Sequence, residues 1–162
     1  MTRWSIAWTG SHEVVVDATP DQIWAVLTDV TRIAEWSHEC RSAEWLDGAA
    51  GPEVGARFRG NNKVGRFGWS RVCTVTELEP GRTFAYRTDG GIPPDSTAWT
   101  FRLEPQFGGT RVTQSYEILK FARWMELATI ALVPPHRDRS AALREDLLRL
   151  GDVAAGTDAV QN

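Results

Sequence analysis

Cysteine, histidine and long apolar runs are all scarce in this chain, and each scarcity narrows the functions it can have. The sequence contains two cysteines, Cys40 and Cys73, and three histidines, His12, His38 and His136. They form no CxxC, HxH or HExxH spacing, and zinc sites need three or four ligands at close spacing, so no metal site is expected. With no CxxC pair, both cysteines are expected to remain reduced thiols.

Excess positive charge is absent as well. Lysine and arginine number 18 against 21 acidic residues, giving a net charge of −3. Without a basic pole, nucleic acid is not an expected partner, and no polybasic tract suited to an anionic membrane is present. The most apolar run, residues 127–133, is too short for a membrane span, and the N-terminus MTRWSIAWTG lacks the apolar segment of a signal peptide. The chain is therefore expected to be soluble and cytoplasmic.

Tryptophan, in contrast, is abundant, with eight residues in a chain of 162. This length is typical of one domain and is enough to bury a substantial core, so a single domain over residues 1–162 is expected. Its core is expected over about residues 12–150, and residues 152–162 are expected to form a frayed tail. Tryptophan is a large, rigid apolar side chain with one hydrogen-bond donor, which suits a core and a ligand cavity equally.

The first part of the sequence predicts a strand followed by two short helices. Residues 12–18, HEVVVDA, are rich in β-branched side chains and predict the strand. Thr19 can then cap a helix, Pro20 suits its first position and Gln22 completes a capping box. Apolar residues follow at helical spacing, and a second short helix is predicted over about 31–36.

The middle of the chain changes to a period of two, which predicts a series of strands. Turn-forming pairs rich in Gly, Pro and Asp separate them. Connections this short favour an antiparallel meander over parallel βαβ units. The predicted strands are 43–47, 55–62, 66–79, 82–89, 96–105 and 110–118.

Helical spacing returns after the last strand. Residues 120–133 predict a helix that ends at Pro134, and residues 137–150 predict another, with Gly151 placed to cap its C-terminus. The predicted apolar face of the first helix consists of Phe121, Trp124, Met125, Ala128 and Leu132. That of the second consists of Ala142 or Leu143, Leu147 and Leu150.

Four segments of the sequence carry motifs of a known superfamily. They are V-x-x-T-P-x-x-I-W-x-x-L-T-D-V over 16–30 with Trp36 after it, V-x-E-L-E-P-G-R over 75–82, W-x-F-x-L-E-P over 99–105 and G-T-R-V over 109–112. On these residues the chain resembles the START-like, Bet v 1-like helix-grip superfamily (SRPBCC), and within it the bacterial polyketide cyclase/dehydrase and lipid-transport branch. The resemblance covers about residues 12–150.

The resemblance implies an α+β helix-grip fold. In this fold a curved seven-stranded antiparallel sheet surrounds a long C-terminal helix, with two short helices after the first strand. A sheet closed by one helix leaves a hollow, so a ligand cavity is expected between the two. The stretch 120–133 would lie near its mouth, either as a lid or as a passage to the last helix. The same fold hosts carriers, cyclases, receptors and co-chaperone modules, so it does not define the function by itself.

Side-chain alternation along the predicted strands indicates which residues face the hollow. Asn62 is expected to point inward because the arginines of the opposite parity are better solvated in water. Asn62 and Gln114 are the most informative of these residues, since a buried amide needs a hydrogen-bond partner that a ligand can provide. The expected ligand-binding residues are Trp36, Phe58, Asn62, Trp69, Arg71, Tyr86, Trp99, Gln114, Tyr116 and Met125.

The facing of strand 66–79 has two alternatives. If Trp69 points inward, Arg71 and Cys73 do as well, and this parity is favoured here. A bulge in the strand would reconcile the two parities. The opposite parity would bury Val72, Thr74, Thr76 and Leu78.

The segment EWSHEC, residues 35–40, is the strongest candidate for chemistry. As metal ligands, His38 and Cys40 make only half a site, and as a nucleophilic pair they lack an oxyanion site. General acid/base work by His38 and Glu39 is the better enzymatic hypothesis, because cyclisation or dehydration of a poly-β-ketone needs a base for an acidic C–H. The alternative places His38 on the surface and pairs Glu39 with Arg41 or Arg59.

The sequence thus predicts binding of a hydrophobic small molecule, such as a polyketide, a lipid or an aromatic metabolite, in an internal cavity. Whether the chain is an enzyme is left open. If it is one, we expect a cofactor-independent cyclase or dehydratase that uses His38 and Glu39. A second alternative, a protein-interaction module of the co-chaperone kind, predicts a filled cavity and a large exposed apolar patch. The chain is expected to be a monomer or a homodimer.

Overall fold

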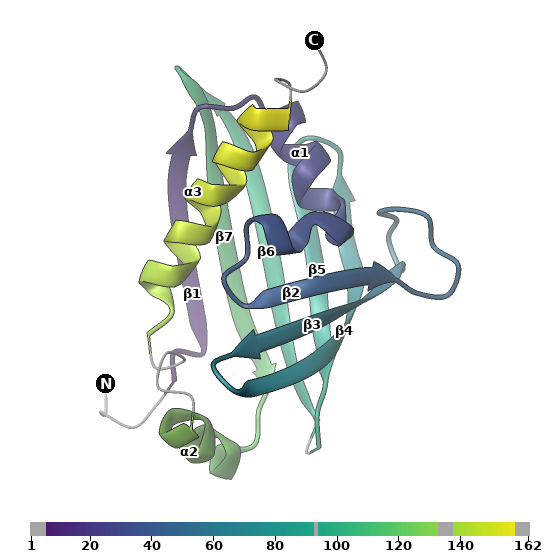
Figure 1. Ribbon diagram of the computed structural model, residues 1–162, viewed down its shortest axis with the longest axis vertical. Coiled ribbons are helices and arrows are strands. Elements are labelled where there is room, and N and C mark those ends of the chain that lie inside the picture. The colour runs from purple at the N-terminus through teal and green to yellow at the C-terminus, as the bar shows by residue number, and fades with distance from the viewer. Residues whose placement is uncertain (1–5, 93, 133–137, 158–162) are drawn as a thin grey trace.

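A seven-stranded antiparallel sheet curves around the last helix in the computed structural model, which describes residues 6–92, 94–132 and 138–157 (Figure 1). The order of the strands across the sheet is β1-β7-β6-β5-β4-β3-β2, so β1 and β2 form its edges. The strands are β1 (Thr9–Val16), β2 (Cys40–Trp45), β3 (Arg57–Val64), β4 (Phe67–Glu79), β5 (Thr83–Gly90), β6 (Asp95–Gln106) and β7 (Gly109–Lys120). The predicted α+β helix-grip fold is confirmed.

Two short helices follow β1, as the sequence predicts: α1 (Pro20–Thr28) and the 3-10 helix η1 (Val30–Glu35). The capping box at the start of α1 is formed. The backbone N–H of Gln22 donates to Thr19 Oγ1 at 3.2 Å, and the backbone N–H of Thr19 donates to Gln22 Oε1 at 2.8 Å. These two hydrogen bonds satisfy donors that the first turn would otherwise leave unpaired.

The C-terminal helix, α3 (Ser140–Thr157), is longer than predicted. The prediction that Gly151 ends this helix is wrong, and residues 152–157, expected to be frayed, are helical. A side chain at Gly151 would place its Cβ only 2.5 Å from Val16 Cβ, so this glycine permits close packing of α3 on β1. Pro134 and residues 158–162 of the predicted tail lie outside the described residues.

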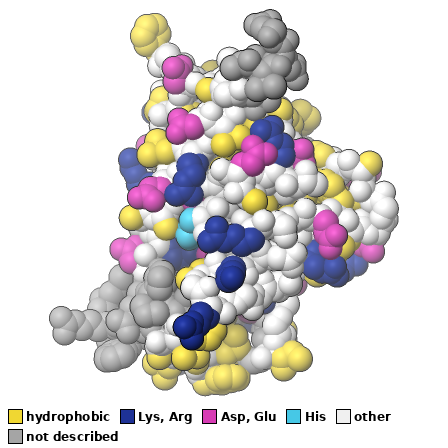
Figure 2. Space-filling model, in the orientation of Figure 1, with side chains coloured by type: hydrophobic (Ala, Val, Ile, Leu, Met, Phe, Trp, Pro, Cys, Tyr) yellow, Lys and Arg dark blue, Asp and Glu magenta, His cyan; other side chains and the backbone are white. Residues whose placement is uncertain are grey.

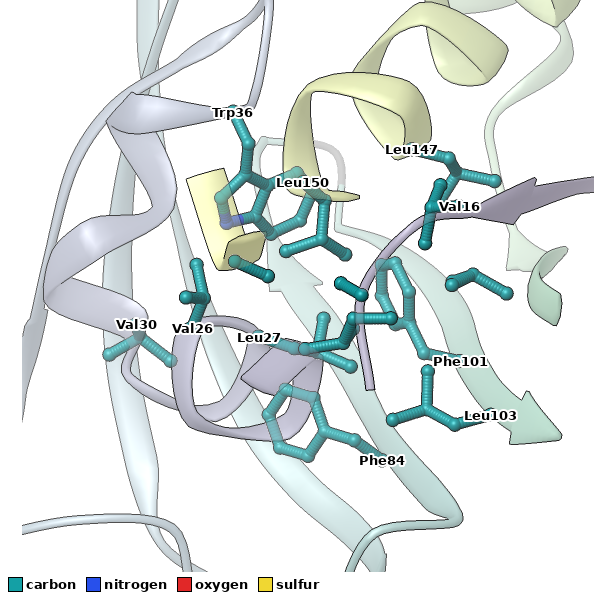
Figure 3. Close-up of a cluster of buried hydrophobic side chains, with 14 of the residues drawn as sticks. Val16, Val26, Leu27, Val30, Trp36, Phe84, Phe101, Leu103, Leu147 and Leu150 are labelled. Atoms are coloured by element: carbon teal, nitrogen blue, oxygen red, sulfur yellow. The ribbon is translucent and has the colours of Figure 1, made fainter. Parts of the chain in front are cut away.

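The hydrophobic core lies between α1, α3 and the sheet (Figure 3). Leu147 and Leu150 of α3 are fully buried and meet Phe101 of β6, which confirms the predicted apolar face of this helix. Burying one such side chain stabilises the fold by roughly 1.5–3 kcal/mol. The labelled core residues are Val16, Val26, Leu27, Val30, Trp36, Phe84, Phe101, Leu103, Leu147 and Leu150. This core fills the end of the sheet that α1 covers and fixes α3 across it.

In β4, which corresponds to the predicted strand 66–79, the side chains that face inward change from odd-numbered to even-numbered positions along the strand. Trp69 and Cys73 face the inside of the molecule, as predicted, and Val75 continues this face at 1% exposure. The register of β4 against β5 shifts between Val75 and Glu77, which is the bulge that the two parities require. Beyond the bulge Leu78 packs against the core.

The predicted helix over 120–133 appears as α2 (Arg123–Leu132), at the end of the sheet opposite α1 (Figure 1). Its predicted apolar face is wrong in part, because Trp124 and Leu132 are exposed. The described part of the chain contains no helix with the length and apolar character that crossing a membrane requires.

Candidate functional site

A cavity of about 700 Å³ lies between the concave face of the sheet, the segment from η1 to β2, α2 and the start of α3. Most of its wall is apolar or aromatic, with Ile33, Ile118 and Phe121 among the lining residues. Every residue that the sequence predicts for ligand binding lies on this wall: Trp36, Phe58, Asn62, Trp69, Arg71, Tyr86, Trp99, Gln114, Tyr116 and Met125. The two candidate acid/base residues, His38 and Glu39, lie on it as well.

One wall of the cavity carries a histidine held by a buried carboxylate. His38 Nδ1 lies 2.6 Å from Asp146 Oδ2, and the backbone N–H of His38 donates to Asp146 Oδ1 at 2.9 Å. Asp146, on α3, is 3% exposed and also accepts from Arg149 Nη1 at 3.3 Å. Because a carboxylate only accepts hydrogen bonds, the neutral imidazole that this contact favours is the tautomer with its proton on Nδ1 and a lone pair on Nε2. The two contacts with Asp146 fix the orientation of the His38 ring on the cavity wall.

A second ion pair adjoins this histidine. Arg139 Nη2 donates to Glu39 Oε2 at 2.6 Å, and Glu39 Oε2 lies 3.7 Å from His38 Nε2. The guanidinium carbon of Arg139 lies 5.6 Å from the centroid of the Trp99 ring, which is cation–π distance. Glu39 therefore pairs with Arg139, which the sequence did not predict, and Arg59, one of the two partners that the sequence offered, pairs with Glu44 instead.

Two tyrosines face the cavity from the sheet. Tyr86 of β5 packs against Phe58 and Phe101, and burial raises the pKa of its phenol well above the usual value. Burial also raises the pKa of Tyr116 on β7, whose ring tilts against Trp99. Both hydroxyls thus remain protonated at neutral pH and able to donate a hydrogen bond.

The oxygen of a buried amide on the wall has no hydrogen-bond partner among the described residues. Gln114 of β7 is 4% exposed, and its Oε1 accepts no hydrogen bond from any described residue. An unsatisfied buried polar atom costs about 1–3 kcal/mol. Its place beside the aromatic side chains makes Gln114 one of the polar groups that a ligand would meet.

Arg71 of the cavity wall is paired with a carboxylate, and the two cysteines of the wall are buried. Arg71 Nη2 donates to Asp95 Oδ2 at 2.8 Å, which neutralises the cation predicted to face inward. Cys40 and Cys73 are buried thiols, and burial raises the pKa of Cys73 to about 12 and also raises that of Cys40. Neither cysteine is an activated nucleophile, since a raised pKa keeps the thiol protonated. No group of three or more metal-ligating side chains occurs within the described ranges.

Two residues of the polar wall escaped the sequence reasoning. Asp146 sits among the residues of α3 that follow helical spacing, and its charge suggested the solvent face. Arg139 precedes α3 in a segment without a motif. One signal was available for Asp146, because it precedes the core residue Leu147 and shares the cavity wall with Leu143, three positions earlier.

The curved sheet, the gripped helix and the hollow between them define a helix-grip protein of the Bet v 1-like, START-like class. The family model described as "Polyketide cyclase / dehydrase and lipid transport" matches residues 7–146. The chain belongs to this family. No curated protein matches the sequence at a significant level.

Solved structures share the fold over most of their length. The Polyketide_cyc-like protein Cgl2372 from Corynebacterium glutamicum is 26% identical, with a TM-score of 0.60 and 93% of each chain covered. The Zhui aromatase/cyclase from Streptomyces sp. R1128 is 18% identical, with a TM-score of 0.66, and the match covers 94% of this chain and 96% of the aromatase/cyclase chain. The protein TTHA0849 from Thermus thermophilus is 14% identical, with a TM-score of 0.71, and the match covers 92% of this chain and 98% of the TTHA0849 chain. The family supports a role in hydrophobic ligand binding or polyketide cyclisation, and the neighbours at 14% and 18% identity show the shared fold.

Proposed function

We propose that this protein binds a hydrophobic small molecule that carries oxygen atoms, such as a polyketide, a lipid or an aromatic metabolite. The observation that carries the proposal is the cavity of about 700 Å³ with one polar wall. Ligand sites of proteins have this size and this composition, mostly apolar with a few polar groups that fix the orientation. A filled interior, as an interaction module requires, does not agree with a hollow of this volume.

The distribution of side chains indicates how such a ligand would lie. Trp69 and Tyr86 offer aromatic surface on the sheet side, which suits a flat or elongated apolar body. His38 and Arg139 gather on the opposite side, beside η1 and α3, where the Arg139 guanidinium could donate to a carbonyl oxygen and His38 Nε2 could accept from a hydroxyl. The ligand is thus expected to be oriented with its oxygens toward α3.

The first test is native mass spectrometry of the purified protein, followed by denaturing extraction of any bound species. A co-purifying lipid or aromatic compound is the expected result. Binding of an apolar fluorescent dye gives an independent measurement, with a cavity-filling substitution as its control. Thr97 lines the cavity and Thr100 lies on the outer face of the same strand. Thr97→Trp is expected to abolish dye binding and Thr100→Trp to preserve it, and equal binding by both variants would contradict the proposal.

The contact between His38 and Asp146, at 2.6 Å, favours a second function in the same cavity, general acid/base catalysis of cyclisation or dehydration. The lone pair of His38 Nε2 would take a proton from a carbon flanked by two carbonyl groups. The electron pair left on that carbon moves into the carbonyl to form an enolate, and a tyrosine hydroxyl in the cavity would donate a hydrogen bond to its oxygen. Asp146 stabilises the imidazolium that results.

The catalytic proposal is tested with a ligand identified by extraction, or with a synthetic β-diketone that exchanges its acidic proton. His38→Asn is expected to lower the rate by about 10²–10⁴-fold while the dissociation constant changes little. His12→Asn is the matched control, because His12 lies outside the cavity wall. Full activity of His38→Asn, with binding intact, would leave the protein as a binding protein without this chemistry.

A further inference from the structure

Exposed apolar side chains gather around α2, at the end of the cavity that we take as its mouth. Trp124 and Leu127 of α2 are 65% and 57% exposed, and Ile92, in the turn between β5 and β6, is fully exposed. We define the apolar rim as Phe67, Ile92, Leu119, Trp124, Leu127 and Leu132. Figure 2 shows hydrophobic side chains gathered at the lower end of the molecule, which is the end where α2 lies in Figure 1, with basic side chains beside them.

The antiparallel register brings these residues to one end. Val64 pairs with Phe67 where β3 turns into β4, and Gly90 pairs with Asp95 where β5 turns into β6. The last residue of β7, Lys120, pairs near the start of β6. Both turns and the connection to α2 therefore lie at the same edge of the sheet. The rim comes from four separate segments that lie at the α2 end of the cavity.

Helix α2 is apolar on two sides. Met125 and Thr129 face the cavity, whereas Trp124 and Leu127 face outward. A helix that is apolar all round is normally buried on all sides, and a contiguous exposed apolar area indicates a docking surface. The outer side of α2 is therefore a candidate docking surface for an apolar partner.

Basic residues accompany the rim. Lys63, Arg66, Lys120 and Arg123 are all exposed, and none of them forms an ion pair within the described part of the chain. Lys63 and Arg66 flank the β3–β4 turn, and Lys120 and Arg123 flank the connection into α2. The mouth is positively charged although the whole chain carries a net charge of −3.

The acidic residues near the mouth do not cancel this charge. Asp95 is paired with Arg71 at 2.8 Å, and Glu126 is buried and accepts from the backbone N–H of Ile6 at 2.8 Å. Glu117 and Asp138 are the exposed acids toward this end. A backbone N–H does not neutralise Glu126, so Glu117, Asp138 and Glu126 are all counted, and these three acids stand against the four basic residues around the rim, which leaves an excess of one positive charge.

We propose that the apolar rim docks on the surface of an anionic lipid bilayer. Single apolar side chains on two turn tips and one helix, with tryptophan at the level of the headgroups and cations around them, are the pattern of interfacial membrane binding. The four cations would contact anionic headgroups. Docking in this way goes beyond ligand binding, because it would let an apolar ligand pass between the bilayer and the cavity without crossing water.

The test uses flotation of the purified protein with vesicles of phosphatidylcholine, alone or mixed with phosphatidylserine. The protein is expected to bind the mixed vesicles, and this binding is expected to weaken as salt is added. Binding to vesicles of phosphatidylcholine alone is expected to be much weaker. Absence of binding to mixed vesicles, or equal binding to both kinds, would overturn the proposal.

Matched variants separate the rim from the rest of the surface. Trp124→Ala combined with Leu127→Ala is expected to weaken partitioning by about tenfold or more, because two apolar side chains no longer enter the interface. The control is Val54→Ala combined with Phe107→Ala, which are also exposed apolar residues but lie away from the mouth. A similar loss in the control would show that general surface hydrophobicity, not the rim, drives binding.

Charge variants test the second half of the proposal. Lys120→Gln combined with Arg123→Gln is expected to weaken binding by about fivefold for each cation removed. Arg82→Gln combined with Arg102→Gln removes the same charge where β5 begins and is expected to change binding little.

Two further measurements complete the test. Sedimentation velocity checks for self-association: a dimer that the α2 variant converts to a monomer would mean that a second copy covers the rim, which overturns the proposal. Dye binding in the cavity should persist in the α2 variant, since Trp124 and Leu127 do not line it. A failure of vesicle binding is thus distinguishable from a failure of ligand binding.

Discussion

His38 and Asp146 are 108 residues apart in the sequence, yet their side chains meet at 2.6 Å on the wall of the cavity. The Asp146 carboxylate also accepts a hydrogen bond from the backbone N–H of His38, so it holds both the imidazole ring and the backbone that leads into β2. One residue of α3 thereby sets the shape of the polar wall.

Replacing Asp146 by Asn is expected to lower the free energy of unfolding by about 2 kcal/mol, because a buried charged acceptor of three hydrogen bonds is lost. Chemical denaturation measures this change. The exposed Asp152 on the same helix is the control, and Asp152→Asn should stay within about 0.5 kcal/mol of the parent protein. In ¹⁵N NMR of the parent protein, the His38 ring is expected to carry its proton on Nδ1. A proton on Nε2 instead would exclude His38 as the base.

Leu147 and Leu148 are neighbours on α3 with opposite environments, 0% and 45% exposed. Leu147→Ala is expected to lower the free energy of unfolding by about 2–5 kcal/mol, because it removes buried surface and leaves a cavity. Leu148→Ala should change it by less than about 1 kcal/mol. Urea denaturation of both variants measures the difference, and equal effects would contradict the position of α3 described here.

Replacing either of two glycines of α3 by alanine should change the stability of the protein in opposite directions. A Cβ at Gly151 would lie 2.5 Å from Val16 Cβ, whereas a Cβ at Gly156 meets nothing within 4 Å. Gly151→Ala is therefore expected to destabilise the protein by more than about 1 kcal/mol, since α3 must move away from β1. Gly156→Ala is expected to stabilise it by a few tenths to about 1 kcal/mol, because alanine restricts the unfolded chain and favours helix. The melting temperatures of the two variants and the parent protein measure these changes. A gain in stability from Gly151→Ala would contradict the close contact between Gly151 and Val16.

Stability should decrease at alkaline pH through Cys73. Burial raises the pKa of this thiol from 9.0 to about 12, so between these values the folded protein keeps the proton and the unfolded chain releases it. Because the unfolded state then binds fewer protons, the free energy of unfolding falls as pH rises, by up to about 1.4 kcal/mol per pH unit for one group. Denaturation curves of the parent protein and of Cys73→Ala at several pH values check this. The variant should show a shallower slope, and identical slopes would mean that Cys73 does not contribute.

Local patterns in the sequence were sufficient for the elements of the fold. The capping box at Thr19 and the alternation of apolar residues act over a few neighbouring residues, so α1 and the seven strands follow from them. The same alternation, with the superfamily resemblance, led to a set of expected binding residues that all line one cavity. Even the ambiguity of strand 66–79 was informative, since its two parities are joined by a bulge.

Helix periodicity was less reliable where two sides of a helix have different neighbours. Phe121, Trp124 and Met125 share a predicted face, but the cavity takes only Phe121 and Met125, and Trp124 is exposed. Gly151 likewise has the signature of a helix end, while its structural role depends on Val16, which is 135 positions away by the sequence numbering. Neither fact can be read from spacing, because each depends on what packs against the helix.

The sequence by itself determined most of the elements and the residues of the sheet that face inward, because these depend on local propensity and on a period of two. The helix-grip class came from the superfamily resemblance that its motifs carry. Only the tertiary structure decided that Asp146 holds His38 and that Arg139 pairs with Glu39. It also brought cations from separate segments to one end, although no polybasic run exists in the chain. The physical reason is the same in each case. Contacts between charged side chains depend on how α3 and the strand turns are placed in space, and sequence periodicity says nothing about distances across the fold.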